Sequence, residues 1–192
     1  MLRTKALTLR SPLAERASAR GFTLVELLTV VVIVGVLATL AVYAVRKYVL
    51  TAKTSEAIQM IGSIKAAQEN YKDETFSYLD VSTTLDSFYP MATPGKMKVQ
   101  WGGGTGGVAD RWRMLGVSAS APVQFGYATT AGTGTQAPSA PIGITIAAWP
   151  GAPTGQPWYV VRAVGDQDGD GTVSVYMSAS FAGQIFFEEE GE

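Results

Sequence analysis

The strongest pattern in the chain is an apolar run near its N-terminus. From Leu27 to Val45, nineteen residues carry no charge. A helix rising ~1.5 Å per residue would carry them nearly across a hydrocarbon core of ~30 Å, and residues 22–28 complete the span. Residues 22–28 include Glu26. Placing a charged side chain at the centre of a membrane-spanning helix costs roughly 2.5 to 3.5 kcal/mol of insertion free energy. Glu26 is therefore a functional candidate, although its place near the start of the span also lets it reach the lipid headgroups.

The apolar run continues into an amphipathic helical pattern over residues 46–73. Apolar residues recur there at spacings of three, four and seven, at Leu50, Ala57, Ile61, Ile64 and Tyr71. No proline interrupts residues 22–73, so the pattern predicts one helix of ~52 residues, on the order of 80 Å long, with Gly35 and Gly62 as candidates for local weakening. We expect the apolar stripe to pack on the chain's own C-terminal domain.

The second half of the chain has the pattern of strands and turns. Glycine and proline gather in residues 75–109, which predicts a loop with a short strand at Lys96 to Trp101. Residues 110–116 suit one helical turn, with Asp110 as its cap and Gly116 as its stop, or a short strand. The remaining candidate strands are Val123 to Tyr127, which alternates apolar and polar residues, and residues 142–148, 158–164, 172–178 and 184–188. An antiparallel sheet across the helical stripe would bury both, which predicts an α+β fold.

The amino-acid composition of the chain excludes several classes of function. A chain of 192 residues suits one globular domain plus an appendage. It has no cysteine and no histidine, which excludes disulfides, a Ser/His/Asp triad, a thiol nucleophile and the usual zinc ligand sets. The body is mildly acidic and has no basic patch, which argues against nucleic-acid binding. We expect no enzyme and no required cofactor.

The residues around the start of the span carry a specific motif. They read Gly21-Phe22-Thr23-Leu24-Val25-Glu26, after a leader with five basic residues and one acidic residue. A secretory signal has an apolar region of ~7 to 15 residues, so this run is too long for one. The segment resembles the class III signal and N-terminal helix of type IV pilins and pseudopilins.

That resemblance implies a set of processing and assembly residues. A prepilin peptidase is expected to cut between Gly21 and Phe22, and Phe22 is then N-methylated. A glycine beside the scissile bond has no Cβ and lets an enzyme approach the backbone closely. The resemblance also implies that Glu26, with Thr23, acts in assembly, where the glutamate neutralises the N-terminal amine of an adjacent subunit. A buried carboxylate is tolerated when it is paired with a cation.

The resemblance further implies a domain organisation. Residues 1–21 form a leader that is removed, and residues 22–45 form the half of the helix that spans the membrane and later enters a filament core. Residues 46–74 form its amphipathic half, residues 75–109 a variable loop and residues 110–192 the β-sheet head. The expected architecture is the pilin fold, a long N-terminal helix packed on a C-terminal antiparallel sheet.

The function implied is that of a structural subunit of a type IV pilus-like filament. The subunit would lie in the inner membrane as a single-pass protein with its N-terminus in the cytoplasm, as the basic leader predicts, and would end in an extracellular fimbrium. Its partners would be the prepilin peptidase, the pilus assembly machinery, further copies of itself and other pilins. Two alternatives stay open: a minor pilin or type II secretion pseudopilin, and a membrane-tethered binding protein that does not polymerise.

One further stretch carries candidate chemistry. Asp166, Asp168 and Asp170 alternate ahead of Gly171, as oxygen ligands do at the start of an EF-hand loop. The twelfth position of such a loop is Met177, so the bidentate glutamate is missing. Asp-Gly between strands also predicts a hairpin turn. The stretch is either a hairpin turn alone or a turn that also holds Ca²⁺, and some pilins and pseudopilins bind calcium near this place.

Overall fold

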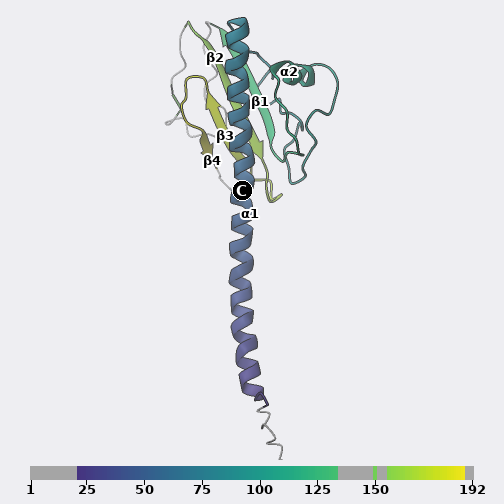
Figure 1. The fold of residues 1–192 in the computed structure, drawn as a ribbon, viewed down its shortest axis with the longest axis vertical. Coiled ribbons are helices and arrows are strands. Elements are labelled where there is room, and N and C mark those ends of the chain that lie inside the picture. The colour runs from purple at the N-terminus through teal and green to yellow at the C-terminus, as the bar shows by residue number, and fades with distance from the viewer. Residues whose placement is uncertain (1–20, 134–148, 151–154, 189–192) are drawn as a thin grey trace, which may run out of the picture. The chain divides into compact units, whose positions relative to one another are not determined.

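In the part of the chain that the structure describes, the fold consists of one long helix, one short helix and a four-stranded sheet (Figure 1). A computed structural model describes residues 21–133, 149–150 and 155–188. The elements, in chain order, are α1 (Leu24–Thr75), α2 (Val108–Leu115), β1 (Gly126–Thr133), β2 (Pro157–Gly165), β3 (Ser174–Ala179) and β4 (Phe186–Glu188). The chain divides into two compact units, Met1–Val42 and Tyr43–Glu192, which are described separately. The predicted α+β class is confirmed.

Helix α1 is a single α-helix of 52 residues, as the absence of proline predicts. Helical structure continues through Gly35 and Gly62, so neither glycine interrupts it. The helix stops after Thr75, where Phe76 adopts a left-handed φ of 62° and its N–H donates to the carbonyl of Lys72 over 2.7 Å. A residue in this conformation just past a helix is a common way of ending it.

The sheet is an antiparallel meander in the order β1-β2-β3-β4. Val161 at its centre lies opposite Thr129 on one side and Ser178 on the other. The predicted strands at residues 158–164, 172–178 and 184–188 are confirmed in position, with later starts at Ser174 and Phe186. The predicted strand at residues 142–148 lies outside the described residues.

The region before the sheet differs from the prediction. Residues 96–101 do not form a strand: Val99 makes one isolated antiparallel bridge to Val123, with both N–H···O bonds at 2.8 and 2.9 Å. Strand β1 begins only at Gly126. A Cβ at Gly126 would meet Phe88 and Pro94 at 2.9 Å, so the chain needs glycine where this loop crosses it.

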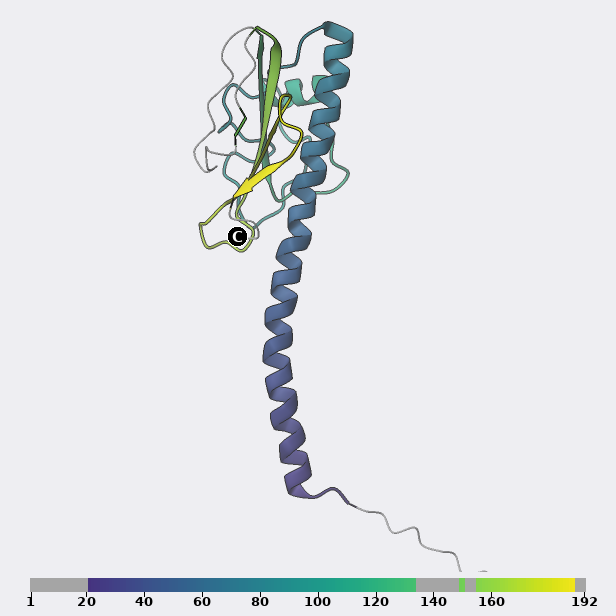
Figure 2. The same cartoon turned by 90° about the vertical axis from the view of Figure 1, so that its left-hand side faces the viewer.

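In the second unit, α1 packs along one face of the sheet (Figure 2). Ala57, Ile61 and Ile64 of the predicted stripe have no exposed surface, and they share a core with Tyr159 and Val161 of β2. Leu50 and Tyr71, at the ends of the stripe, are half-buried. Burying one such isoleucine contributes about 1.5 to 3 kcal/mol, so the stripe accounts for the docking of helix on sheet.

The opposite face of the sheet is also apolar. It forms a second cluster of buried side chains that includes Leu85, Trp158, Val160, Val175 and Met177. With both faces covered, eight of the nine residues of β2 are buried. The charged residue among them, Arg162, pairs with Asp86.

The sequence left either a helical turn or a short strand open for residues 110–116, and the structure forms a helix there, α2. Gly116 ends it in the left-handed conformation, as predicted. The predicted cap is wrong, because the helix begins earlier, at Val108, and its cap residue is Gly107, which makes no side-chain capping bond. Asp110 lies inside the first turn and pairs with Arg113. Trp112 of this helix packs edge-on against Trp101, with ring centroids 5.3 Å apart.

Candidate functional site

The start of α1 is closed by a reciprocal hydrogen-bonded pair. Glu26 Oε2 accepts hydrogen bonds from the backbone N–H of Thr23 at 2.9 Å and from the Thr23 hydroxyl at 2.7 Å. The Thr23 hydroxyl oxygen in turn accepts from the backbone N–H of Glu26 at 3.2 Å. This is a capping box, in which a threonine and a glutamate three residues later satisfy the free donors of a helix start. Both residues named for assembly in the sequence are therefore brought into direct contact.

The predicted cleavage bond lies just outside that cap. Gly21 and Phe22 precede the helix and have no regular secondary structure. The Phe22 side chain is 84% exposed. Residues 1–20 of the predicted leader lie outside the described residues. The capping box therefore leaves the bond between Gly21 and Phe22 in non-helical, accessible backbone.

Beyond the cap, the first half of α1 presents its apolar side chains on every side. Each large apolar residue from Leu24 to Val45 is at least half exposed. The helix contains a window of mean hydropathy 2.6 near its N-terminus, long and apolar enough to cross a membrane. A helix that is apolar all round requires an apolar environment.

The three aspartates of the candidate calcium loop lie together in the connection between β2 and β3. One carboxylate oxygen from each of Asp166, Asp168 and Asp170 lies within 4.8 Å of the others, with Asp166 half-buried and the other two exposed. Each carboxylate already accepts a backbone N–H: Asp166 from Gly169 at 2.6 Å and Gly171 at 3.2 Å, Asp168 from Asp170 at 3.1 Å, and Asp170 from Thr172 at 2.6 Å. Met177 is buried inside β3 and offers no twelfth ligand.

The sequence did not point to the contacts that anchor this loop to α1. The carbonyl of Gln167 accepts a hydrogen bond from Lys53 Nζ at 2.7 Å and another from Gln124 Nε2 at 3.2 Å. The Gln167 side chain is fully buried and donates to the Ser174 hydroxyl at 3.2 Å. A helical lysine and a loop glutamine separated by more than a hundred residues carry no pattern that marks them as partners.

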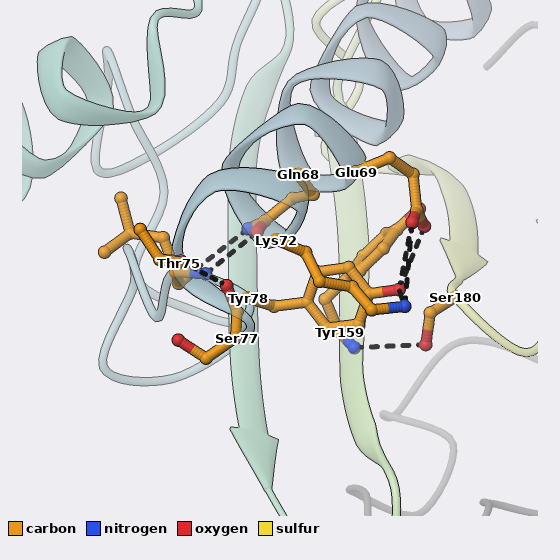
Figure 3. A network of polar contacts seen from close by, with 9 residues as sticks. Gln68, Glu69, Lys72, Thr75, Ser77, Tyr78, Tyr159 and Ser180 are labelled. Carbon is orange, nitrogen blue, oxygen red and sulfur yellow. Dashed lines mark hydrogen bonds and ion pairs between the residues drawn. The ribbon is translucent and has the colours of Figure 1, made fainter.

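A second polar network closes the other end of α1 (Figure 3). The Gln68 side-chain amide pairs with the backbone of Leu79, donating over 2.8 Å and accepting over 3.0 Å. The Tyr78 hydroxyl donates to the Glu69 carboxylate at 3.0 Å and accepts from Lys72 Nζ at 3.1 Å. Burial raises the pKa of Tyr78, and the hydrogen bond to Tyr78 raises the pKa of Lys72. These contacts bind the chain that follows the helix back onto it.

The comparisons with known proteins match only part of the chain. Residues 16–42 match the family model described as the prokaryotic N-terminal methylation motif. The type II secretion system core protein G of Pseudomonas aeruginosa is 34% identical over 87 residues, 45% of this chain and 61% of that protein. The type IV major pilin protein PilE of Neisseria gonorrhoeae is 36% identical over 78 residues, 36% of this chain and 47% of that protein.

A third relative is the type IV major pilin protein PilA of Myxococcus xanthus. It is 36% identical over 66 residues, 34% of this chain and 30% of that protein. The aligned part thus spans between 30% and 61% of the length of these three relatives. No solved structure matches the chain significantly.

The protein combines a match to the methylation motif, an apolar helix long enough to cross a membrane and an α+β head. Over part of its length the chain is similar to type IV major pilins and to a type II secretion system core protein.

Proposed function

We propose that this protein is a structural subunit that polymerises into a type IV pilus-like filament through the first half of α1. The observation that carries the proposal is the exposed apolar helix that begins at the box of Thr23 and Glu26. Such a helix is stable in lipid before assembly and among other helices afterwards. The relatives named as type IV major pilins support the same function.

Glu26 has one oxygen left for a partner. Both hydrogen bonds from Thr23 go to Oε2, and among residues 21–133 no hydrogen bond to Oε1 is present. A carboxylate that leaves water for a helical core needs a cation to offset its desolvation. In the proposed mechanism that cation is the free amine of Phe22 in an adjacent copy, while Thr23 keeps the carboxylate fixed.

Processing precedes assembly in this scheme. The subunit inserts with its basic leader in the cytoplasm, a prepilin peptidase cuts after Gly21, and Phe22 is methylated. The exposed, non-helical backbone at Gly21 and Phe22 supports cleavage at this bond, because it leaves the bond accessible to an enzyme. The assembly machinery then moves the helix from the inner membrane into an extracellular fimbrium built from copies of this chain and other pilins.

The experiment that tests the proposal is the intact mass and N-terminal sequence of the protein in filaments sheared from cells. We expect a chain that begins at N-methylated Phe22 and is abundant in the sheared fraction. An uncut chain, or one that never leaves the membrane and never polymerises, would contradict the proposal.

A pseudopilin or minor pilin is the second candidate, favoured by the similarity to a type II secretion core protein. A pseudopilin or minor pilin would be cut and methylated in the same way, but the processed chain would be scarce in sheared surface material. A tethered, non-polymerising protein predicts instead that Glu26→Ala leaves function intact. We propose no catalytic role, because the chain has no histidine or cysteine for acid–base or thiol chemistry.

We also propose that the loop of Asp166, Asp168 and Asp170 holds Ca²⁺. Three carboxylates within 4.8 Å repel one another unless a cation offsets their charge. They supply three of the six to eight oxygens that Ca²⁺ takes, and backbone carbonyls and water supply the rest. The test is a thermal melt of the detergent-solubilised protein in calcium or chelator, with Asp168→Asn as the matched variant. At about 100-fold over Kd, calcium adds ~2.7 kcal/mol; an unchanged midpoint at millimolar calcium would contradict binding.

A further inference from the structure

The last turn of α1 carries two carboxylates in an unfavourable place. Asp73 and Glu74 lie two residues and one residue, respectively, before the helix ends at Thr75. Negative charge near a helix C-terminus typically costs ~0.3 to 1 kcal/mol, because the helix dipole is negative there. Both side chains are exposed, and neither forms an ion pair within the described residues. The neighbouring Lys72 donates instead to Tyr78 (Figure 3).

A basic pair at the other end of the same unit is equally unpaired. Arg46 and Lys47 are the first charged residues after the apolar run, and both are exposed. In the part of the chain that the structure describes, neither side chain forms an ion pair or a hydrogen bond. The second unit therefore has a free basic pair at one end of its helix and a free acidic pair at the other.

The geometry of α1 relates the two pairs. About seven and a half turns of helix, or ~40 Å, separate Arg46 from Asp73 and Lys47 from Glu74. A half-integral number of turns places the two pairs on opposite sides of the helix. When two copies lie side by side in the same orientation, one side of the first α1 helix faces the opposite side of the second α1 helix. A shift of ~40 Å along the axis then brings the basic pair of one copy against the acidic pair of the other.

We propose that copies of this chain pack in parallel with this stagger, so that Arg46 and Lys47 of one copy pair with Asp73 and Glu74 of the next. The inference rests on the proposed filament function and adds the register between subunits. The contact joins two different surfaces of the same molecule, so it repeats without closing, as a filament requires. Exposed ion pairs contribute little energy individually, and their role here is to select one register among the many that an apolar helix surface permits.

A cysteine pair tests the register directly. The chain has no cysteine, so Lys47→Cys and Glu74→Cys introduce the two thiols of an otherwise thiol-free protein. The two positions are ~40 Å apart on one helix, whereas a disulfide needs Cα atoms ~4.4 to 6.8 Å apart. Any disulfide must therefore join two copies. After mild oxidation of sheared filaments, we expect a ladder of linked chains from the double variant.

The matched control moves the second thiol to a different height on the helix. Ser63 is exposed on α1, eleven residues before Glu74 and therefore on nearly the same side of the helix. Lys47→Cys with Ser63→Cys thus offers two thiols at the wrong stagger. Neither that variant nor either single variant should form the ladder. Filaments that form with the Lys47/Glu74 pair but give no ladder, or an equal ladder from the Ser63 control, would overturn the proposed stagger.

Charge reversal tests the pairing itself and separates it from the filament proposal. We expect Arg46→Glu with Lys47→Glu, and Asp73→Lys with Glu74→Lys, each to lose sheared filament while the chain is still cut at Phe22. The fourfold variant should recover filaments. Failure of the fourfold variant, as expected if Arg46 and Lys47 serve only lipid headgroups, overturns the pairing. Absence of filaments from the unaltered protein would instead contradict the proposed function.

Discussion

The ammonium group of Lys53 donates a 2.7 Å hydrogen bond to the backbone carbonyl of Gln167, and so ties α1 to the aspartate loop. The bond is partly buried, and the same carbonyl accepts from the Gln124 side chain. The position of the loop therefore depends on a residue of the helix.

Loss of this contact should loosen the loop more than the fold. For Lys53→Met, which keeps much of the apolar stem, we expect a cost of about 1 kcal/mol. Hydrogen exchange of the detergent-solubilised protein should show faster exchange at Gly169 and Gly171. Lys47→Met, at an exposed lysine without such a contact, is the control. Equal protection of the loop in both variants would contradict the anchoring role.

The capping and charge roles of Glu26 can be separated. Glutamine at the same position of a capping box also accepts from the helix start, so Glu26→Gln should keep the first turn of α1 but fail to form filaments. Thr23→Ala should instead weaken that turn by about 0.5 to 2 kcal/mol. Amide exchange at residues 24–27 measures the cap, and sheared filament protein measures assembly. Normal assembly of Glu26→Gln would show that the charge is not required.

The packing of α1 on the sheet predicts a contrast between two isoleucines of one helix. Ile61 has no exposed surface, whereas Ile58 is 46% exposed. Ile61→Ala should lower the free energy of unfolding of the head by about 2 to 5 kcal/mol through lost burial and a cavity. Ile58→Ala should change it by about 0.5 kcal/mol or less. Urea titrations followed by tryptophan fluorescence measure both, and similar midpoints would contradict the observed docking face.

Two buried tyrosines of the core should respond differently to loss of their hydroxyl groups. Among the described residues, the Tyr127 hydroxyl is buried without a hydrogen-bond partner, whereas the Tyr176 hydroxyl lies 3.0 Å from the Thr54 hydroxyl. Tyr127→Phe removes an unsatisfied polar group and should be neutral or stabilising. Tyr176→Phe should cost about 1 kcal/mol. A larger loss for Tyr127→Phe would reveal a partner for that hydroxyl.

Burial of tyrosine side chains predicts that the folded protein loses stability at alkaline pH. Burial raises the pKa values of Tyr127, Tyr159 and Tyr78 in the folded state above the unfolded value. The folded state therefore holds these protons more tightly, and the stability they contribute is complete below pH ~10 and is lost as the pH rises above it. The melting midpoint should fall as the pH is raised from 8 to 12. The tyrosinate absorbance of the folded protein should appear at a higher pH than that of an exposed tyrosine. Constant midpoints across that range would contradict the burial.

The sequence by itself determined the long helix, its two halves and the residues at its start. Its signals there are local: an uncharged run, the absence of proline and a period of 3.6, each of which acts within a few residues. Three strands of the sheet were also readable, because apolar runs between turn residues favour strands whatever their partners are.

Only the tertiary structure decided which of these residues meet. The single bridge that replaces the strand predicted at residues 96–101 and the contacts of Lys53 and Gln68 all depend on chain segments that are not adjacent in sequence. Gln68 is the clearest case, since its amide pairs with the backbone of Leu79 only because the chain turns back after Phe76. A polar side chain on a helix carries no local sign of such a partner. Its burial becomes favourable only when the fold brings matching hydrogen-bonding groups to it.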